Sequence, residues 1–221
     1  MLIERLPDHA PAVSPKPGLL LFGAGGHARV VADAVLCSGR WGAVRASDRN
    51  GEVCIGELLP GVAMVTLTDL LDAKEQACAL HVSIGNNIFR QREASALGLE
   101  RLMTVAHPRA SVSPHALIAA GCFIAAQSVL SPGAQLGTGV IVNHAAVVDH
   151  DVRVGAFSHI APGAVLGGAA QIGARVLIGA GAVVLPGVSV CDDAVIGAGA
   201  LVRDHVRTAG TWVGVPARRL K

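Results

Sequence analysis

The hydrophobic residues of the C-terminal half recur at a fixed interval of six. From Val112 to Val202 every sixth residue is Val, Ile or Leu, sixteen times in succession without a gap. Two positions before each of them stands a small or β-branched residue, from Ala110 to Ala200, and glycine often follows the aliphatic residue. This period matches neither an amphipathic helix nor a single strand, so it indicates an internal repeat.

The repeat predicts a coil of very short strands. Two inward-facing residues separated by one outward-facing residue form a three-residue strand. The remaining three residues of each hexad turn a corner, where glycine relieves the backbone. Three hexads close a triangular coil, and the whole repeat makes about five coils. The pattern resembles the hexapeptide repeat of left-handed parallel β-helices, and the left-handed winding rests on that resemblance because strand crossovers are otherwise right-handed. An antiparallel sandwich would need irregular loops and alternating runs, and the sequence has neither.

The outward-facing residues fall on three faces, of which two are aliphatic and one is largely polar. The first aliphatic face carries Val129, Val147, Val165, Val183 and Leu201, the second carries Phe123, Ile141, His159, Leu177 and Val195, and the polar face carries Leu117, Gln135, Arg153, Gln171 and Ser189. Aliphatic faces of this extent favour association. A closed ring with three-fold symmetry suits a triangular prism, so we expect a homotrimer.

Residues 18–104 follow another pattern. Apolar strands such as "GLLLF" and "ALHVSIG" each precede a turn and an amphipathic helix, which predicts a small parallel sheet of half-Rossmann type. Ligands of such sheets bind at the carboxyl ends of the strands, where Gly25, Gly26, His27, Gly85 and Asn86 gather. A plain tight turn is the alternative for the glycine-rich segment. Fewer than 90 residues supply one mononucleotide-binding half, which favours a nucleotide attached to a sugar over a dinucleotide.

The expected fold class is therefore an α/β N-terminal domain followed by a left-handed parallel β-helix. The predicted division is a flexible tail at 1–17, the α/β domain at 18–104, the β-helix at 105–205 and a C-terminal tail at 206–221.

Composition narrows the class of protein. Apolar residues make up 52% of the chain, but Gly or Pro interrupts the apolar runs well before the length that spans a bilayer. A net charge of +2 without basic runs argues against a nucleic-acid partner. Five cysteines without CxxC spacing favour reduced thiols and a cytoplasmic location. We therefore expect no membrane span. We also expect no metal, because the histidines lack the spacing of metal ligands.

His150 is the candidate general base. It lies in "VVDHDVRVG" at an outward corner, between Asp149 and Asp151, either of which could orient the ring and stabilise the imidazolium. His144 occupies the same place one hexad earlier without an adjacent carboxylate. The His150 corner lies where the first aliphatic face meets the polar face, at the edge of the expected subunit contact. A solvated surface histidine is the alternative.

Several separated motifs resemble those of the sugar O- and N-acetyltransferases within the hexapeptide-repeat acyltransferase superfamily. They are "GAGGHARVV", "SIGNN" followed by arginine, "HPRASVSP", "VVDHDVRVGAFSHIAPGAVLGG" and "WVGVPARRL", spread from Leu19 to Leu220. This family includes sialic acid O-acetyltransferase, GDP-perosamine N-acetyltransferase and the bacillosamine-pathway N-acetyltransferase. The resemblance implies acetyl-CoA as co-substrate, a nucleotide-linked amino sugar as acceptor, and a trimer.

The resemblance also implies individual roles. His150 corresponds to the general base and Asp151 to the acid that raises its basicity. The residues expected to contact acetyl-CoA are His159, Gly168, Ala180 and Ala198, with Gly168 beside the thioester. The residues expected to hold the nucleotide-sugar are Gly25, Gly26, His27, Ser47, Asp48 and Gly85, with Asn86 in the same turn. The family often has two acidic residues where this chain has Ser47 and Asp48.

Two roles have open alternatives. His159 lies in an aliphatic stripe and so needs a polar partner, and a structural hydrogen bond across the trimer is the alternative to cofactor contact. Arg218 and Arg219 could reach a CoA phosphate, with a solvated C-terminus as the alternative.

The leading hypothesis is an acetyl-CoA-dependent N-acetyltransferase that acts on a UDP-4-amino-dideoxy sugar or a GDP-perosamine type of substrate, with His150 as general base. The alternatives are O-acetylation of a sialic-type sugar and a non-catalytic trimeric nucleotide-sugar-binding protein.

Overall fold

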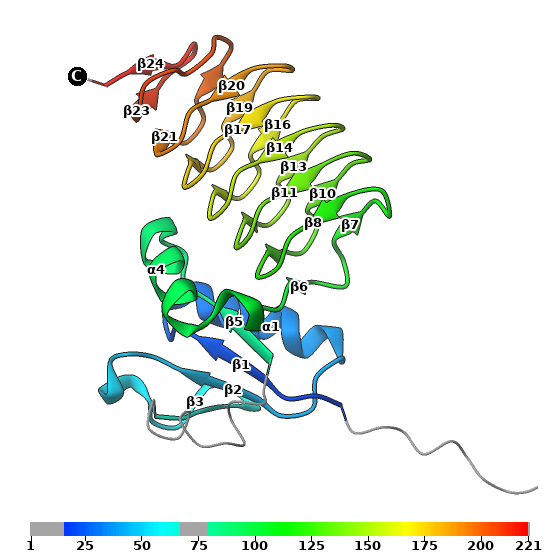
Figure 1. Cartoon of the computed structure of the whole chain (residues 1–221), viewed down its shortest axis with the longest axis vertical. Coiled ribbons are helices and arrows are strands. Elements are labelled where there is room, and N and C mark those ends of the chain that lie inside the picture. The colour runs from blue at the N-terminus through cyan, green and yellow to red at the C-terminus, as the bar shows by residue number, and fades with distance from the viewer. Residues whose placement is uncertain (1–15, 67–78, 221) are drawn as a thin grey trace, which may run out of the picture.

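The computed structural model of the chain describes residues 16–66 and 79–220. Most of the predicted N-terminal tail lies outside these ranges. The described chain forms an α/β domain beneath a tall triangular coil (Figure 1), so the predicted fold class is confirmed. None of the helices in the described ranges has the length and apolar character needed to cross a bilayer.

The α/β domain is built on one five-stranded sheet. Its elements are β1 (Leu19–Phe22), α1 (Gly26–Ser38), β2 (Val44–Ser47), η1 (Gly51–Val53), β3 (Glu57–Leu59), β4 (Val62–Met64), β5 (Ala79–Val82), α4 (Asn87–Leu97) and η2 (Leu99–Arg101). The strand order is β3-β4-β2-β1-β5, and only the β3–β4 pair is antiparallel. The carboxyl ends of β1, β2 and β5 therefore meet at one edge, where the ligand was expected.

The coil has three sheets, here named sheet B, sheet C and sheet D. Sheet B contains β6 (Val105–Ala106), β9 (Phe123–Ile124), β12 (Ile141–Val142), β15 (His159–Ile160), β18 (Leu177–Ile178), β21 (Ala194–Ile196), β23 (Gly210–Val213) and β24 (Arg218–Arg219). Sheet C contains β7 (Ser111–Val112), β10 (Val129–Leu130), β13 (Val147–Val148), β16 (Val165–Leu166), β19 (Val183–Val184) and β22 (Leu201–Val202). Sheet D contains β8 (Leu117–Ile118), β11 (Gln135–Leu136), β14 (Arg153–Val154), β17 (Gln171–Ile172) and β20 (Ser189–Val190).

The predicted inward positions form one continuous core. The aliphatic residues Ile160, Leu166 and Ile178 are fully buried, and so are the small or β-branched residues two positions before them, such as Ala164. Successive coils pair in parallel register, for example Val147 with Val165 in sheet C. Because the aliphatic side chains fill the centre, the coil needs few aromatic residues.

The corners differ from the expectation in one respect. The left-handed backbone conformation occurs at the third residue of fourteen successive corners, of which seven are glycine and seven carry a side chain, Asp151 among them. Glycine is required directly after the aliphatic residue for another reason. A Cβ at Gly137 would lie 2.7 Å from the amide nitrogen of Ala156, and one at Gly179 would lie 2.6 Å from that of Ala198. Close stacking of the next coil, rather than backbone relief, requires glycine there.

The second aliphatic face is partly covered within the chain. Phe123 and Ile141 are each 1% exposed because they pack on the α/β domain, in one cluster with Ala28 and Val31 of α1. The expectation that this whole face is free for a neighbour is therefore wrong for its first two residues. The first aliphatic face, on sheet C, stays half-exposed along its length.

The residues that follow the last full coil extend sheet B. Strand β23 pairs in parallel with β21, and β24 returns antiparallel to β23. Arg218 and Arg219 thus lie on a strand at the C-terminal end of the coil (Figure 1).

Removal of an inward aliphatic side chain should destabilise the coil strongly. Ile178→Ala, in the filled centre, should cost about 2–5 kcal/mol in the free energy of unfolding, because the surrounding stack cannot collapse into the cavity. The matched control is Leu117→Ala, on sheet D and 65% exposed, which should change the denaturant midpoint little. Similar losses in both variants would show that the inward and outward positions are misassigned.

Candidate active site

A cavity of about 360 Å³ opens at the carboxyl ends of β1, β2 and β5. It contains five of the predicted nucleotide-sugar residues, and its lining is Phe22, Gly23, Ala24, Gly25, Gly26, His27, Asp48, Arg49, Ser83, Ile84, Gly85, Phe89, Arg92 and Glu93. Asn86 is next to this lining and caps α4, since its side-chain oxygen accepts a hydrogen bond from the Phe89 amide at 3.0 Å. Ser47 is buried one residue before Asp48.

Three residues in the cavity lining or next to it carry a polar atom that lacks a partner in the described chain. The buried atoms without a hydrogen bond are His27 Nε2, Ser47 Oγ and Ser83 Oγ. Helix α1 begins at Gly26, and no side chain caps its N-terminus. Buried polar groups are normally satisfied, so these atoms indicate that the cavity accepts a polar ligand. Ser83 was missed by the sequence reasoning, although it stands at the end of a predicted strand as Ser47 does.

The Asp48 carboxylate is already engaged by the backbone. Its two oxygens accept hydrogen bonds from the amides of Ala24, at 2.9 Å, and Asn50, at 3.0 Å. These bonds tie the end of β2 to the glycine-rich turn. Asp48 therefore shapes the cavity whether or not it also contacts a ligand.

His27 and His159, which the sequence analysis assigned to different ligands, lie together. Their ring centroids are 6.1 Å apart, and His27 also packs edge-on against Phe123. Burial, together with the positive potential of neighbouring groups, lowers the pKa of His27 to about 3 and that of His159 to about 4. His159 is hydrogen-bonded within the chain, to Asn143 at 3.1 Å and to the backbone of Gly85. Both rings are thus neutral at physiological pH.

Arg90 joins the cavity to the coil and was given no role from the sequence. It is 1% exposed and donates hydrogen bonds to the carbonyl oxygens of Ile84 (2.9 Å), Gly85 (3.0 Å), Gly139 (2.8 Å) and Phe157 (2.7 Å). Burial without a carboxylate partner lowers the pKa of Arg90 to about 9, so the guanidinium remains charged at neutral pH. A single arginine therefore binds the cavity loop to two corners of the coil.

His150 stands at the corner between sheet C and sheet D, with its side chain 60% exposed. Its Nδ1 is 3.0 Å from Asp151 Oδ2, whereas Asp149 accepts a hydrogen bond from the His150 backbone amide at 2.7 Å. The structure thus answers which aspartate orients the ring: it is Asp151. The hydrogen bond to Asp151, followed by the charge of Asp149, raises the pKa of His150.

Gly168 lies under the His150 ring, one coil further along. A Cβ on Gly168 would overlap Nε2 and Cε1 of His150, so only glycine permits this ring position. Nε2 therefore faces the Gly168 backbone while Nδ1 faces Asp151. The three residues predicted for the reacting centre are brought together.

The other residues predicted to contact acetyl-CoA lie elsewhere. Ala180 and Ala198 are exposed and stacked at the corner between sheet B and sheet C, where the Gly199 amide donates to the Ala180 carbonyl at 2.8 Å. Arg218 and Arg219 are exposed at the C-terminal end, with Arg218 Nη1 3.7 Å from Asp204 Oδ2. Within one chain these positions do not form a single cavity with His150.

The nucleotide cavity and His150 are also separated within one chain. The α/β domain packs on sheet B and on the corner between sheets D and B, where Phe157 and Gly139 lie. His150 occupies the corner opposite sheet B, and no coil residue lines the cavity. Within the described residues of one chain, the nucleotide cavity and His150 thus lie on different sides of the coil.

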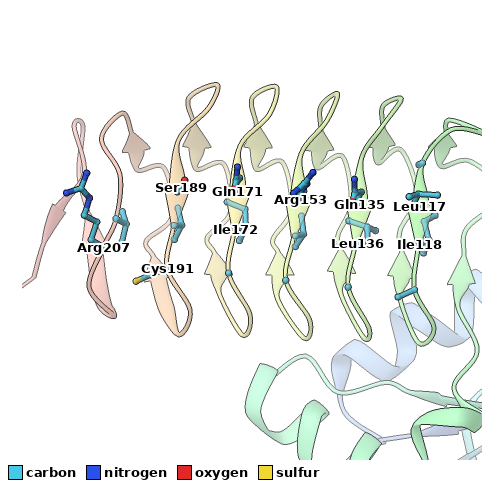
Figure 2. Close-up of a pocket in the computed structure, with 18 residues that line it drawn as sticks. Leu117, Ile118, Gln135, Leu136, Arg153, Gln171, Ile172, Ser189, Cys191 and Arg207 are labelled. Atoms are coloured by element: carbon cyan, nitrogen blue, oxygen red, sulfur yellow. The ribbon is translucent and has the colours of Figure 1, made fainter.

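A larger hollow in the described part of the chain contains none of the predicted site residues. It measures about 1000 Å³ and runs along the polar face of sheet D, where Gln135, Arg153 and Gln171 stand in a row (Figure 2). It is a shallow strip along the sheet, whereas two of the residues with an unpartnered buried polar atom among the described residues, His27 and Ser83, line the smaller cavity. We therefore assign the ligand to the smaller cavity.

One group in the described ranges, Asp33, Cys37 and His107, has the spacing of metal ligands. His107 Nδ1 accepts a hydrogen bond from the Arg109 amide at 3.0 Å, so a neutral His107 carries its proton on Nε2. A metal-bound histidine normally donates a hydrogen bond from its second nitrogen, and this ring has no lone pair left for an ion. The group does not suit a metal.

Comparisons with known proteins agree with this architecture. Residues 18–97 match the PglD N-terminal domain, and residues 169–204 match the bacterial transferase hexapeptide model of six repeats. No curated protein sequence matches the chain.

Solved structures resemble it along nearly its whole length. The acetyltransferase domain of PglB from Neisseria gonorrhoeae FA1090 is 36% identical, with a TM-score of 0.84, over 92% of this chain and 99% of that one. The same domain has been solved in complex with acetyl coenzyme A, at 36% identity over 94% of this chain and 100% of that one. A histidine-to-alanine variant of GDP-perosamine N-acetyltransferase from Caulobacter crescentus, in complex with CoA and GDP-perosamine, is 32% identical with a TM-score of 0.83, over 91% and 95% of the two chains. The shared domains, the shared coil and these identities show that the chain is an acyltransferase enzyme and belongs to the sugar O- and N-acetyltransferase family of hexapeptide-repeat proteins.

Proposed function

We propose that this enzyme transfers the acetyl group of acetyl-CoA to the amino group of a nucleotide-linked amino sugar, with His150 as general base. The observation that carries the proposal is the His150–Asp151 pair set over Gly168 at an open corner. The relatives support the substrates, because one was solved with acetyl coenzyme A and another with CoA and GDP-perosamine.

The geometry suggests how the residues share the chemistry. With Nδ1–H donating to Asp151, the lone pair of His150 Nε2 is available to take a proton from the attacking amine. Asp151 stabilises the imidazolium that results. The Gly168 amide donates no hydrogen bond to another described residue, so it is the candidate donor to the thioester oxyanion. No covalent enzyme intermediate is needed.

We also propose that the active site is shared between subunits of a homotrimer. His150 lies at the edge of sheet C, whose aliphatic face remains half-exposed, while the nucleotide cavity lies on the far side of the coil. Packing of this face on a neighbour would bring His150 of one subunit toward the cavity of another. Acetyl-CoA would then run between subunits, past Gly168 of one and Ala180 and Ala198 of the other, with Arg218 and Arg219 near its phosphates.

His150→Ala should lower kcat by ~10² or more and leave acetyl-CoA affinity nearly unchanged, because a general base acts mainly in the transition state. The matched control is His144→Ala, an exposed corner histidine one hexad earlier whose backbone amide bonds to Asn143 and which has no carboxylate partner among the described residues. Release of free thiol measures the rate, and calorimetry measures the affinity. Equal losses in the two variants would refute the assignment.

The pH dependence of activity should reveal the effect of Asp151 on the pKa of His150. The base must be neutral, so activity should rise with pH through the pKa of His150, which Asp151 raises. Asp151→Asn removes the charge that stabilises the imidazolium, so the rising limb should move to lower pH while the plateau falls. Asp33→Asn, on the exposed face of α1, should leave the limb in place. A limb that stays put or moves to higher pH in Asp151→Asn would contradict this role.

Mixed trimers should reveal a shared site. His150→Ala lacks the base, and Gly85→Val places a branched side chain in the lining of the nucleotide cavity, so each variant alone should have little activity. Co-expression should restore about a quarter of the sites, because some subunit contacts then pair an intact base with an intact cavity. If one chain held the complete site, co-expression would restore nothing.

A further inference from the structure

A buried carboxylate lies at the wall of the nucleotide cavity without a role in the proposed chemistry. Glu93, on α4, is 2% exposed and is bound from two sides. Its Oε2 accepts a hydrogen bond from Arg49 Nε at 2.6 Å, and its Oε1 accepts from Arg92 Nε at 3.1 Å and Nη2 at 2.9 Å. Arg49 follows β2 and Arg92 belongs to α4, so one carboxylate joins two elements across the cavity.

Both guanidinium groups keep free donors at the cavity. Among the described residues, Arg49 donates to Glu93 through Nε and leaves Nη1 and Nη2 unused, and Arg92 leaves Nη1 unused. The guanidinium carbon of Arg92 also lies 5.1 Å from the centre of the Phe89 ring, which limits its rotation. The two side chains are 56% and 64% exposed, so they remain accessible from solvent. Ion pairs to a buried acid hold them in a defined orientation.

The opposite wall also presents hydrogen-bond donors. Helix α1 begins at Gly26 without a side-chain cap, and the Ser83 residue is 2% exposed with no partner for its hydroxyl among the described residues. Formal charges around the cavity cancel, since Asp48 and Glu93 balance the two arginines. Asp48, however, is turned to backbone amides and Glu93 to the arginines, so the groups left for a ligand are mainly donors. Such a set favours phosphate oxygens.

We propose that Arg49 and Arg92, held apart and oriented by Glu93, bind the phosphate groups of the nucleotide and select a nucleoside diphosphate over a monophosphate. This inference rests on the proposed function, which assigns the nucleotide to this cavity. One phosphate at the α1 N-terminus satisfies that wall alone, whereas a diphosphate can engage the helix and the arginines together. Glu93 is a positioning residue in this arrangement, because it acts through the two arginines.

Titration calorimetry with UDP, UMP, GDP and GMP tests the arginines. Wild-type protein should bind at least one diphosphate more tightly than its monophosphate. Arg49→Ala and Arg92→Ala should each weaken the diphosphate by ~10-fold or more and the monophosphate by much less, because each removes a charge-assisted hydrogen bond. Arg40→Ala is the matched control: it removes one exposed positive charge from the same domain, just beyond the far end of α1.

The outcomes separate the proposed phosphate clamp, which is the pair Arg49 and Arg92 oriented by Glu93, from the proposed function. If the wild-type protein binds neither UDP nor GDP, the nucleotide assignment fails and the clamp fails with it. If the wild-type protein binds them and the arginine variants bind them equally well, the clamp alone is refuted. An equal loss for diphosphate and monophosphate would refute the selection of diphosphates, since the arginines would then contact a group that both ligands share, namely the base, the ribose or the α-phosphate.

Glu93→Gln distinguishes positioning from charge. The glutamine oxygen can accept a hydrogen bond from one arginine, while its NH₂ group would face the other. One of the two arginine side chains should therefore lose its orientation. Positioning therefore predicts weaker UDP or GDP binding although a negative charge has been removed, and Glu93→Asp should restore part of it. Tighter binding by Glu93→Gln would overturn the positioning role. Thermal unfolding of each variant checks that the domain remains folded.

Discussion

The close stacking of successive coils is the constraint on which the rest of the structure depends. Parallel strands in neighbouring coils are held at the spacing of one β-ladder, ~4.8 Å, which leaves no room for a Cβ at Gly137 or Gly179. The same stacking aligns each corner with the corner of the next coil. His150 meets Gly168 for this reason, and a strict repeat length is what brings base and glycine together.

The second interaction of wide consequence is the Arg90 network. Its guanidinium is the centre of a set of carbonyl oxygens drawn from the cavity loop and from two coils, so the α/β domain has a defined position on sheet B. Asn87 adds two bonds to the carbonyl oxygens of Arg175 and Val176. In the described part of the chain this charge is bound by neutral oxygens alone, which is costly, and truncation of such a group leaves its partners unsatisfied. The position of the α/β domain on the coil therefore combines this polar network with the apolar packing of Phe123 and Ile141 on α1.

The periodic part of the structure could be predicted from the sequence, and the interactions between periodic elements could not. Inward and outward positions follow from the six-residue period, as Ile178 and Gln135 illustrate. Phe123 and Ile141 have the same outward phase as Leu177, and only the placement of the α/β domain decides that they are buried. The choice of Asp151 over Asp149 depends on the left-handed backbone of Asp151, which directs its carboxylate to the ring. Arg90 gave no signal beyond its place after "SIGNN", because its carbonyl partners come from distant parts of the chain.

The two ends of the coil have a consequence for the solution behaviour of the protein. A stack of parallel strands exposes unpaired backbone donors and acceptors at both ends, and each end could template another copy in a head-to-tail fibre. The α/β domain packs against the first end, where α1 contacts β6. At the other end β24 runs antiparallel to β23, which breaks the parallel pattern that a further coil would have to continue. The α/β domain and β24 thus cap the two ends of sheet B, and an uncapped coil would expose strand edges that favour head-to-tail association.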